Sequence, residues 1–88
     1  MFVILFYDVN EKRVGKMLKL CRQYLIWQQN SVFEGEISVA KLEELKIKIN
    51  RLIKKSDEDS VIIYEFRSML YSKRVILGKD KKINFDFI

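Results

Sequence analysis

The chain has 88 residues, a formal net charge of +5 and 49% hydrophobic residues, with no histidine and a single cysteine. This length allows one small domain that buries only about two-thirds of its unfolded surface, so dimerisation would add useful burial. The missing histidine removes the commonest general base and metal ligand, and one cysteine excludes a disulfide framework or a cysteine-rich zinc site.

The chain opens with an uninterrupted apolar run, Phe2 to Tyr7, which predicts a strand buried on both faces. This run is too short for the core of a signal peptide, and no segment approaches the roughly 20 apolar residues of a membrane span. Together with the lone cysteine, these features favour a cytoplasmic protein with no membrane contact. Asp8, the first charged residue of the chain, ends this strand.

A helix is predicted from Glu11 to Leu25, because apolar residues recur there at helical spacing. Gly15 inside this helix marks either a close approach of another backbone or a tolerated surface glycine. The apolar face of the helix is expected to comprise Val14, Met17, Leu18, Cys21 and Leu25.

The middle of the chain, Ile26 to Glu36, is predicted to be extended. It forms either one bent strand or two short strands that meet near Asn30 and Ser31. Ser38 is a good N-cap for a second helix, which we predict over Val39 to Lys55.

The last part of the chain contains three predicted strands. The first two span Asp59 to Phe66 and Tyr71 to Leu77, and Gly78 ends the second. The third, Ile83 to Ile88, alternates apolar and polar residues and needs a surface to cover its apolar side. We therefore expect a domain over residues 1–78, followed over residues 79–88 by a charged linker and a C-terminal strand swapped onto a partner.

The order of these elements predicts an α+β protein of the ferredoxin-like type, a split βαβ antiparallel sheet with two helices on one face. The helix-free face of such a sheet would be either a binding platform or a dimer interface. We favour a homodimer in which the C-terminal strand pairs with the sheet edge of the partner.

Asp8 is the first candidate for chemistry. In an alternating strand it shares a face with Phe2, Ile4 and Phe6. If that face packs across a two-fold axis, the two copies of Asp8 approach each other and could share a Mg²⁺ ion, whose bound water could attack a phosphodiester. The alternative is that Asp8 simply caps the first helix or closes the turn.

Basic residues on the first helix are candidates for nucleic-acid contacts, and the net charge of the chain is consistent with an anionic partner. The alternative is an ordinary solvated helix face. The candidates that could track a phosphate backbone are Lys12, Lys16 and Lys19, with Arg13 and Arg22 nearby.

Two segments of the chain resemble the small Cas2 proteins of CRISPR adaptation systems. The segment from Tyr7 to Arg13 resembles the family's Tyr-Asp-Val strand end and polar, basic helix start, and the segment from Gln29 to Gly35 resembles its Ser-Val-Phe-Glu strand. Residues 59–64 and 75–78 also match the later strands of the family. The resemblance covers nearly the whole chain, in the right order.

This resemblance implies a ferredoxin-like homodimer with a C-terminal strand lying on the partner subunit. It implies a metal-dependent endonuclease in which Asp8 of each subunit shares Mg²⁺, with Tyr7, Ser31 and Phe33 as signature residues near the site. It also implies the Cas1 integrase as a partner in spacer acquisition, and DNA or RNA as a ligand of the basic helix residues.

Two functions follow as alternatives. The first is a Mg²⁺-dependent endonuclease that cleaves phosphodiesters of RNA or DNA, in which a metal-bound hydroxide compensates for the missing histidine. The second is a non-catalytic dimeric scaffold that bridges integrase subunits and holds duplex DNA. A toxin-like ribonuclease and a ligand-binding regulator of the same fold are further alternatives. The chain departs from many relatives in its wholly apolar strand Val61 to Ile63.

Overall fold

A computed structural model describes residues 1–81 of the chain. Its elements, in order, are β1 (Phe2–Asp8), α1 (Glu11–Arg22), β2 (Ile26–Gln29), β3 (Val32–Glu36), α2 (Val39–Leu52), the 3₁₀ helix η1 (Lys55–Asp57) and β4 (Ser60–Phe66).

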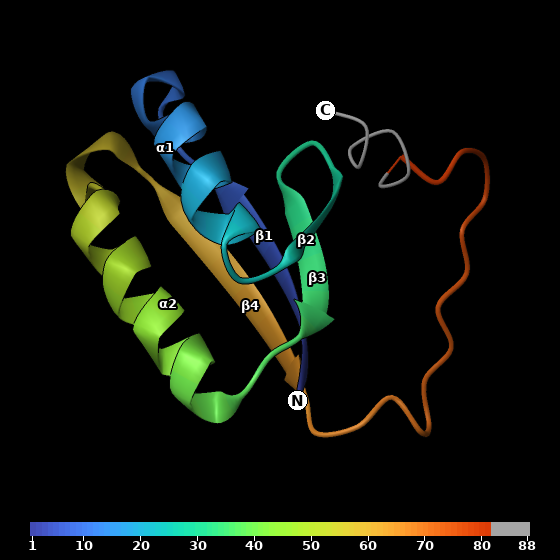
Figure 1. The fold of residues 1–88 in the computed structure, drawn as a ribbon. Helices are drawn as coiled ribbons and strands as arrows, with labels where there is room; N and C mark the ends of the chain where they lie inside the picture. The colour runs from blue at the N-terminus through green and yellow to red at the C-terminus, as the bar shows by residue number, and fades with distance from the viewer. Residues whose placement is uncertain (82–88) are drawn as a thin grey trace.

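The four strands form one antiparallel sheet in the order β2-β3-β1-β4. Both helices pack on one face of this sheet, and the opposite face, here called the open face, carries no helix (Figure 1). This arrangement confirms the predicted ferredoxin-like fold. It also places β1 between two neighbours, so that the end of β1 is held inside the sheet.

The core lies between the sheet and the helices. Val3, Leu5 and Tyr7 of β1 point into it, together with Phe33 of β3. The intervening residues of β1 lie on the open face, where Phe6 is 38% exposed. The prediction that β1 is buried on both faces is therefore wrong, because no helix or second sheet among residues 1–81 covers the open face.

Both helices end earlier than their apolar periodicity predicted. Helix α1 ends at Arg22, because Tyr24 and Leu25 donate their backbone N–H groups to the carbonyl of Cys21 and turn the chain toward β2. Helix α2 ends at Leu52, and η1 follows it. The buried face of α1 also differs from the prediction: Val14 is exposed, and Arg13, Met17 and Cys21 are buried.

The extended middle segment forms two strands, which decides between the two alternatives. Asn30 adopts a positive φ of 44° at the turn between β2 and β3, and its carbonyl accepts a hydrogen bond from Nε1 of Trp27 at 3.0 Å. Gly15 is a surface glycine, because a Cβ built on it would meet nothing within 4 Å.

The predicted strand from Tyr71 to Leu77 is wrong for the described chain, where this segment has no regular structure. Strand formation needs a neighbouring backbone, and this segment leaves the end of β4 and runs on the open-face side without pairing to a sheet edge (Figure 1). Tyr71 is 95% and Leu77 91% exposed. The predicted strand Ile83 to Ile88 lies outside the described residues. No helix within residues 1–81 is long and apolar enough to cross a membrane.

Candidate functional site

Asp8 is the last residue of β1 and lies on the open face, opposite Ser60 at the start of β4. Its side chain is exposed, and its carboxylate forms no hydrogen bond or ion pair within residues 1–81. The capping alternative is wrong, because the N-cap of α1 is Asn10, whose side chain accepts a hydrogen bond from the backbone N–H of Lys12. Asp8 is therefore an accessible carboxylate with no structural partner.

Large apolar side chains border Asp8 on the open face. The next position on the same side of β1 is Phe6, which faces Ile62 across the β1–β4 pair. The ring of Phe6 meets the ring of Tyr64 edge-on, with centroids 5.9 Å apart. Because Ile62 and Tyr64 are both more than half exposed, this patch suits burial against another surface.

The signature residues Tyr7, Ser31 and Phe33 contact the end of β1 or lie on the core side of the sheet next to it. Tyr7 points into the core and its ring stacks on Phe33 at a centroid distance of 6.2 Å. Burial raises the pKa of the Tyr7 hydroxyl, with the nearby Cys21 adding to the effect. The backbone N–H of Tyr7 donates to the carbonyl of Ser31 at 3.2 Å, which ties the β2–β3 turn to β1 next to Asp8. Tyr7 and Phe33 thus pack the core beside Asp8.

Whether the end of β1 can bind a metal ion depends on the oxygen, nitrogen and sulfur ligands that lie near Asp8. Within residues 1–81, no three histidine, cysteine, aspartate or glutamate side chains gather so that they could hold a metal. Mg²⁺ is commonly bound through one or two carboxylates and keeps several of its waters. The unpaired carboxylate of Asp8 therefore fits half of a Mg²⁺ site, and a second chain would have to supply the other half.

Four of the predicted nucleic-acid contacts are exposed along α1. We call Lys12, Lys16, Lys19 and Arg22 the basic stripe. Because α1 covers the face of the sheet opposite to the open face, the basic stripe and the side chain of Asp8 lie on different faces of the molecule (Figure 1). Only Lys12, in the first turn of α1, lies at the same end of the sheet as Asp8.

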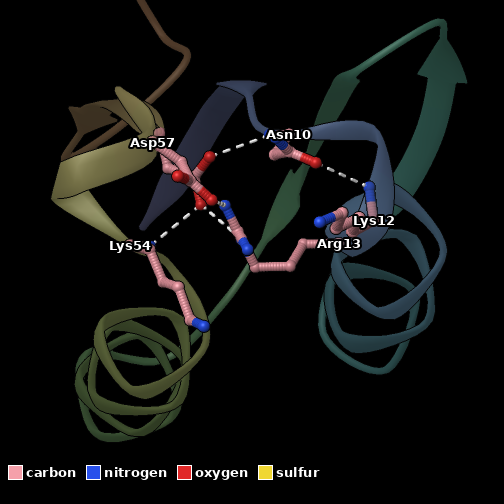
Figure 2. A network of polar contacts seen from close by, with 6 residues as sticks. Asn10, Lys12, Arg13, Lys54 and Asp57 are labelled. Atoms are coloured by element: carbon pink, nitrogen blue, oxygen red, sulfur yellow. Dashed lines mark hydrogen bonds and ion pairs between the residues drawn. The ribbon is translucent and has the colours of Figure 1, made fainter.

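Arg13, the fifth predicted contact, is buried and ion-paired (Figure 2). Its Nε donates to Oδ2 of Asp59 and its Nη2 to Oδ2 of Asp57, each at 2.6 Å. The guanidinium holds the pKa of the Asp59 carboxyl well below its usual range, and the two carboxylates raise the pKa of Arg13 in turn. We therefore assign Arg13 to this internal network and leave it out of the basic stripe.

Asp57 and Asp59 were not predicted as partners of Arg13, and Asp59 was predicted only as the start of a strand. A usable signal was present: Arg13 stands four residues before Met17 and eight before Cys21, on the stripe that a helix buries. A buried arginine requires an acidic partner, so the acidic cluster before β4 was the place to look.

Arg74 was also missed. It pairs with Glu34 of β3 and donates to Oε1 of Gln28 at 2.6 Å, so it fastens the segment after β4 to the open-face side of the sheet. Ion pairs of this kind depend on which segments meet in space, and the sequence pattern carries no signal for them.

Comparisons with known proteins agree with one another. Residues 1–74 match the family described as CRISPR associated protein Cas2. The chain is 53% identical over 81 residues to the CRISPR-associated endoribonuclease Cas2 of Dictyoglomus turgidum, covering 92% of each chain. It is 48% identical over 88 residues to the protein of the same name in Thermococcus kodakarensis, covering 100% of both.

Solved structures show the same fold. A crystal structure of Cas2 matches with a TM-score of 0.79 at 48% identity, covering 92% of this chain and 90% of that one. The crystal structure of Streptococcus pyogenes Cas2 at pH 6.5 matches with a TM-score of 0.75 at 31% identity, covering 89% of this chain and 100% of that one.

Proposed function

This chain belongs to the Cas2 family of CRISPR-associated proteins, and from that premise we propose that it works as a cytoplasmic homodimer that binds Mg²⁺ and cleaves phosphodiester bonds of RNA or DNA. One observation carries the proposal: Asp8 is an exposed carboxylate without a partner among residues 1–81, at the edge of an apolar face that a second copy would cover. The relatives named above are endoribonucleases over essentially the same length, which supports a nuclease.

The dimer would form through the open face. Phe6, Ile62 and Tyr64 supply apolar area that one chain leaves exposed. A two-fold axis through this patch would bring the two copies of Asp8 toward each other, and two carboxylates at close range repel unless a cation lies between them. We extend the proposal to residues 79–88, which would comprise a linker and a C-terminal strand that pairs with the partner.

Each part of the chain then has a task. The two Asp8 carboxylates hold the ion, and the apolar side chains around them limit the access of bulk water. When bound, Mg²⁺ supplies a nucleophile derived from water and offsets charge on the phosphate. Lys12, at the same end of the sheet, would contact the phosphate backbone next to the scissile bond.

A second function is a scaffold in CRISPR adaptation, in which the dimer bridges Cas1 integrase subunits and holds duplex DNA. The observation that favours it is the position of the basic stripe, which lies on the helix side of the sheet, away from Asp8. DNA bound along Lys16, Lys19 and Arg22 would not reach the Asp8 carboxylates. A dimer can hold DNA in this way without cleaving it.

The test compares Asp8→Asn with the parent protein on single-stranded RNA and on duplex DNA, with Mg²⁺ or with chelator. We expect the parent to cleave at least one substrate only with Mg²⁺, and Asp8→Asn to lose at least about 100-fold in rate. Glu43→Gln is the matched control, because it neutralises an exposed carboxylate on α2, far from the open face. Equal cleavage by parent and Asp8→Asn would refute the nuclease proposal, and tight DNA binding without cleavage would favour the scaffold.

A further inference from the structure

Asp59 ties the start of α1 to the chain that follows α2, at the end of the sheet where Asp8 lies, through contacts with Asn10, Arg13 and Lys54 (labelled in Figure 2). Its side chain is fully buried. Oδ1 accepts the backbone N–H of Asn10 at 2.8 Å, and Oδ2 accepts the backbone N–H of Lys54 at 2.9 Å and Nε of Arg13 at 2.6 Å. One carboxylate thus holds the β1–α1 loop, the first turn of α1 and the chain that follows α2.

The hydrogen bond between Asp59 and Asn10 lies next to the end of β1, where Asp8 is located. Asp8 and Ser60 form the last pair of the β1–β4 ladder, while the pairing of β1 with β3 ends earlier, at Phe6. Terminal pairs of a ladder open more easily than internal ones. Asp59 immediately precedes Ser60 and Asn10 follows Asp8 by two residues, so the bond between Asp59 and the Asn10 N–H closes the ladder just beyond its last pair.

We propose that Asp59 is a positioning residue that fixes the β1–α1 loop and thereby holds the Asp8 carboxylate where it can bind a divalent ion. The inference rests on the proposed metal-binding role of Asp8. Arg13 has a supporting part, because its guanidinium satisfies the buried Asp59 carboxylate while the backbone N–H of Asn10 takes the other oxygen. No buried polar side-chain atom of the described chain lacks a partner, so the network is complete.

Asp57 provides a matched control within the same network. It also pairs with Arg13 at 2.6 Å, but within residues 1–81 its carboxylate accepts no hydrogen bond from the β1–α1 loop. Asp57→Asn and Asp59→Asn therefore each remove one acidic partner of Arg13. Only Asp59→Asn also weakens the hydrogen bond from the backbone N–H of Asn10. A purely structural role of the network predicts similar behaviour of both variants toward metal.

The primary measurement is the broadening of the Asp8 amide resonance during titration of the full chain with Mn²⁺, at a temperature where circular dichroism shows each variant folded. We expect Asp59→Asn to need about 10-fold more Mn²⁺ than the parent, as is typical when a residue that orients a ligand is changed. Asp57→Asn should stay within about two-fold of the parent. Equal Mn²⁺ dependence of Asp59→Asn and Asp57→Asn overturns the proposal.

A second pair of variants keeps the test decisive if Asp59→Asn does not fold. Asn10→Pro deletes the N–H that Asp59 accepts, and the φ of −53° at Asn10 suits proline. Asn10→Ala removes the same N-cap side chain but keeps the N–H. We expect Asn10→Pro to need about 10-fold more Mn²⁺ than Asn10→Ala, and equal values overturn the proposal.

The same titration separates this inference from the proposed nuclease. If the parent binds Mn²⁺ at Asp8 but cleaves no substrate, nuclease activity fails while the positioning role is still judged by the variants. If the parent shows no broadening at Asp8, both fail together. Where cleavage is observed, the loss in Asp59→Asn should be recovered in part by raising Mg²⁺, with the KM for nucleic acid unchanged.

Discussion

Arg13 and Asp59 form a buried ion pair that holds the β1–α1 loop and the chain after α2 together at one end of the sheet. Both are buried, and each satisfies the charge of the other. Removing one partner of a buried ion pair leaves an uncompensated charge, which destabilises a protein far more than losing an exposed pair. The pair therefore matters for stability as well as for the position of the β1–α1 loop.

The pH dependence of stability tests this pair. The pKa of Asp59 is lower in the folded protein than its ordinary value of 3.8, so its contribution is fully present above that value and is lost as the pH falls toward the folded pKa. We expect Asp59→Asn to lower the Tm at pH 7 by on the order of 10 °C. The Tm difference between parent and variant should shrink below about pH 4, because Asp59 of the unfolded parent then takes up a proton while the folded protein still holds it ionised. A difference that stays constant from pH 7 to pH 2 would contradict this assignment.

At the level of single residues, the sequence predicted the position of Asp8 but not the burial or the partners of Arg13. Asp8 was correctly placed at a strand end on an alternating face, because strand periodicity fixes the side to which a residue points. Helical periodicity also places Arg13 on the buried side of α1, but its positive charge led to the prediction that it contacts nucleic acid. Its pairing with Asp57 and Asp59 joins residues more than 40 positions apart, and only the fold brings them together.

Helix α1 carries both a core face and the basic stripe. Its buried residues pack on the sheet, and its lysines face solvent. Gly15 lies on the exposed side of this helix with open space around it. Because the backbone of glycine loses more freedom on folding than that of alanine, this position weakens α1, and nothing among residues 1–81 lies close enough to Gly15 to compensate.

Gly15→Ala should stabilise the protein by about 0.5–1 kcal/mol, measured as the free energy of unfolding in urea. Gly35→Ala is the contrasting variant: Gly35 adopts a φ of 153° in β3, where an L side chain is strained, so that change should destabilise. A loss of stability on Gly15→Ala would contradict the open surroundings of Gly15 and would indicate that a second copy approaches α1 there.

The basic stripe makes its own prediction. Replacing Lys16 and Lys19 by glutamine should weaken duplex DNA binding and reduce the steepness of its salt dependence by about 0.9 for each phosphate that is no longer neutralised. Lys41 and Lys48 on α2 are the matched control, since they are exposed lysines outside the stripe. Equal losses of affinity from both pairs, measured by fluorescence anisotropy over a range of salt concentrations, would argue that only net charge matters.

Element boundaries were predicted well where local signals exist and poorly where they do not. The start of α2 agrees with its Ser38 cap, and the start of α1 agrees with the polar residues before it. The strand predicted from Tyr71 to Leu77 failed, because strand-forming residues become a strand only beside a free sheet edge. Within the described chain this segment has no such neighbour.

The whole molecule presents two unlike faces. The helix side carries the basic stripe, and the open face carries exposed Phe6, Ile62 and Tyr64 with Asp8 at one end. An antiparallel sheet commonly leaves one face to solvent, but such a face is usually polar. The ferredoxin-like topology was predictable from the order of elements, whereas the proposed use of the open face as a dimer interface requires a second chain, on which the order of elements carries no information.

The dimer proposal can be tested at matched positions. Ile62 on the open face is 52% exposed and Ile47 on α2 is 51% exposed. Ile62→Glu should raise the dimer dissociation constant by at least about 10-fold, because a charge would be buried at the interface. Ile47→Glu should leave it unchanged. Sedimentation equilibrium measures both, and a dimer insensitive to Ile62→Glu would place the interface elsewhere.

The tail can be tested in the same experiment. Deleting residues 83–88 should also weaken the dimer, because the proposed swapped strand would no longer pair with the partner. The parent and a chain extended by a short glycine–serine segment serve as controls. An unchanged dissociation constant after the deletion would refute strand exchange and leave the open face as the sole contact.

The proposed metal site has one divalent ion shared by the Asp8 residues of two chains. The stoichiometry of Mn²⁺ binding, measured by electron paramagnetic resonance on the purified dimer, tests this sharing. The shared site predicts one tightly bound ion for every two chains in the parent and none in Asp8→Asn. One ion for every chain, or binding that survives Asp8→Asn, would contradict a shared site.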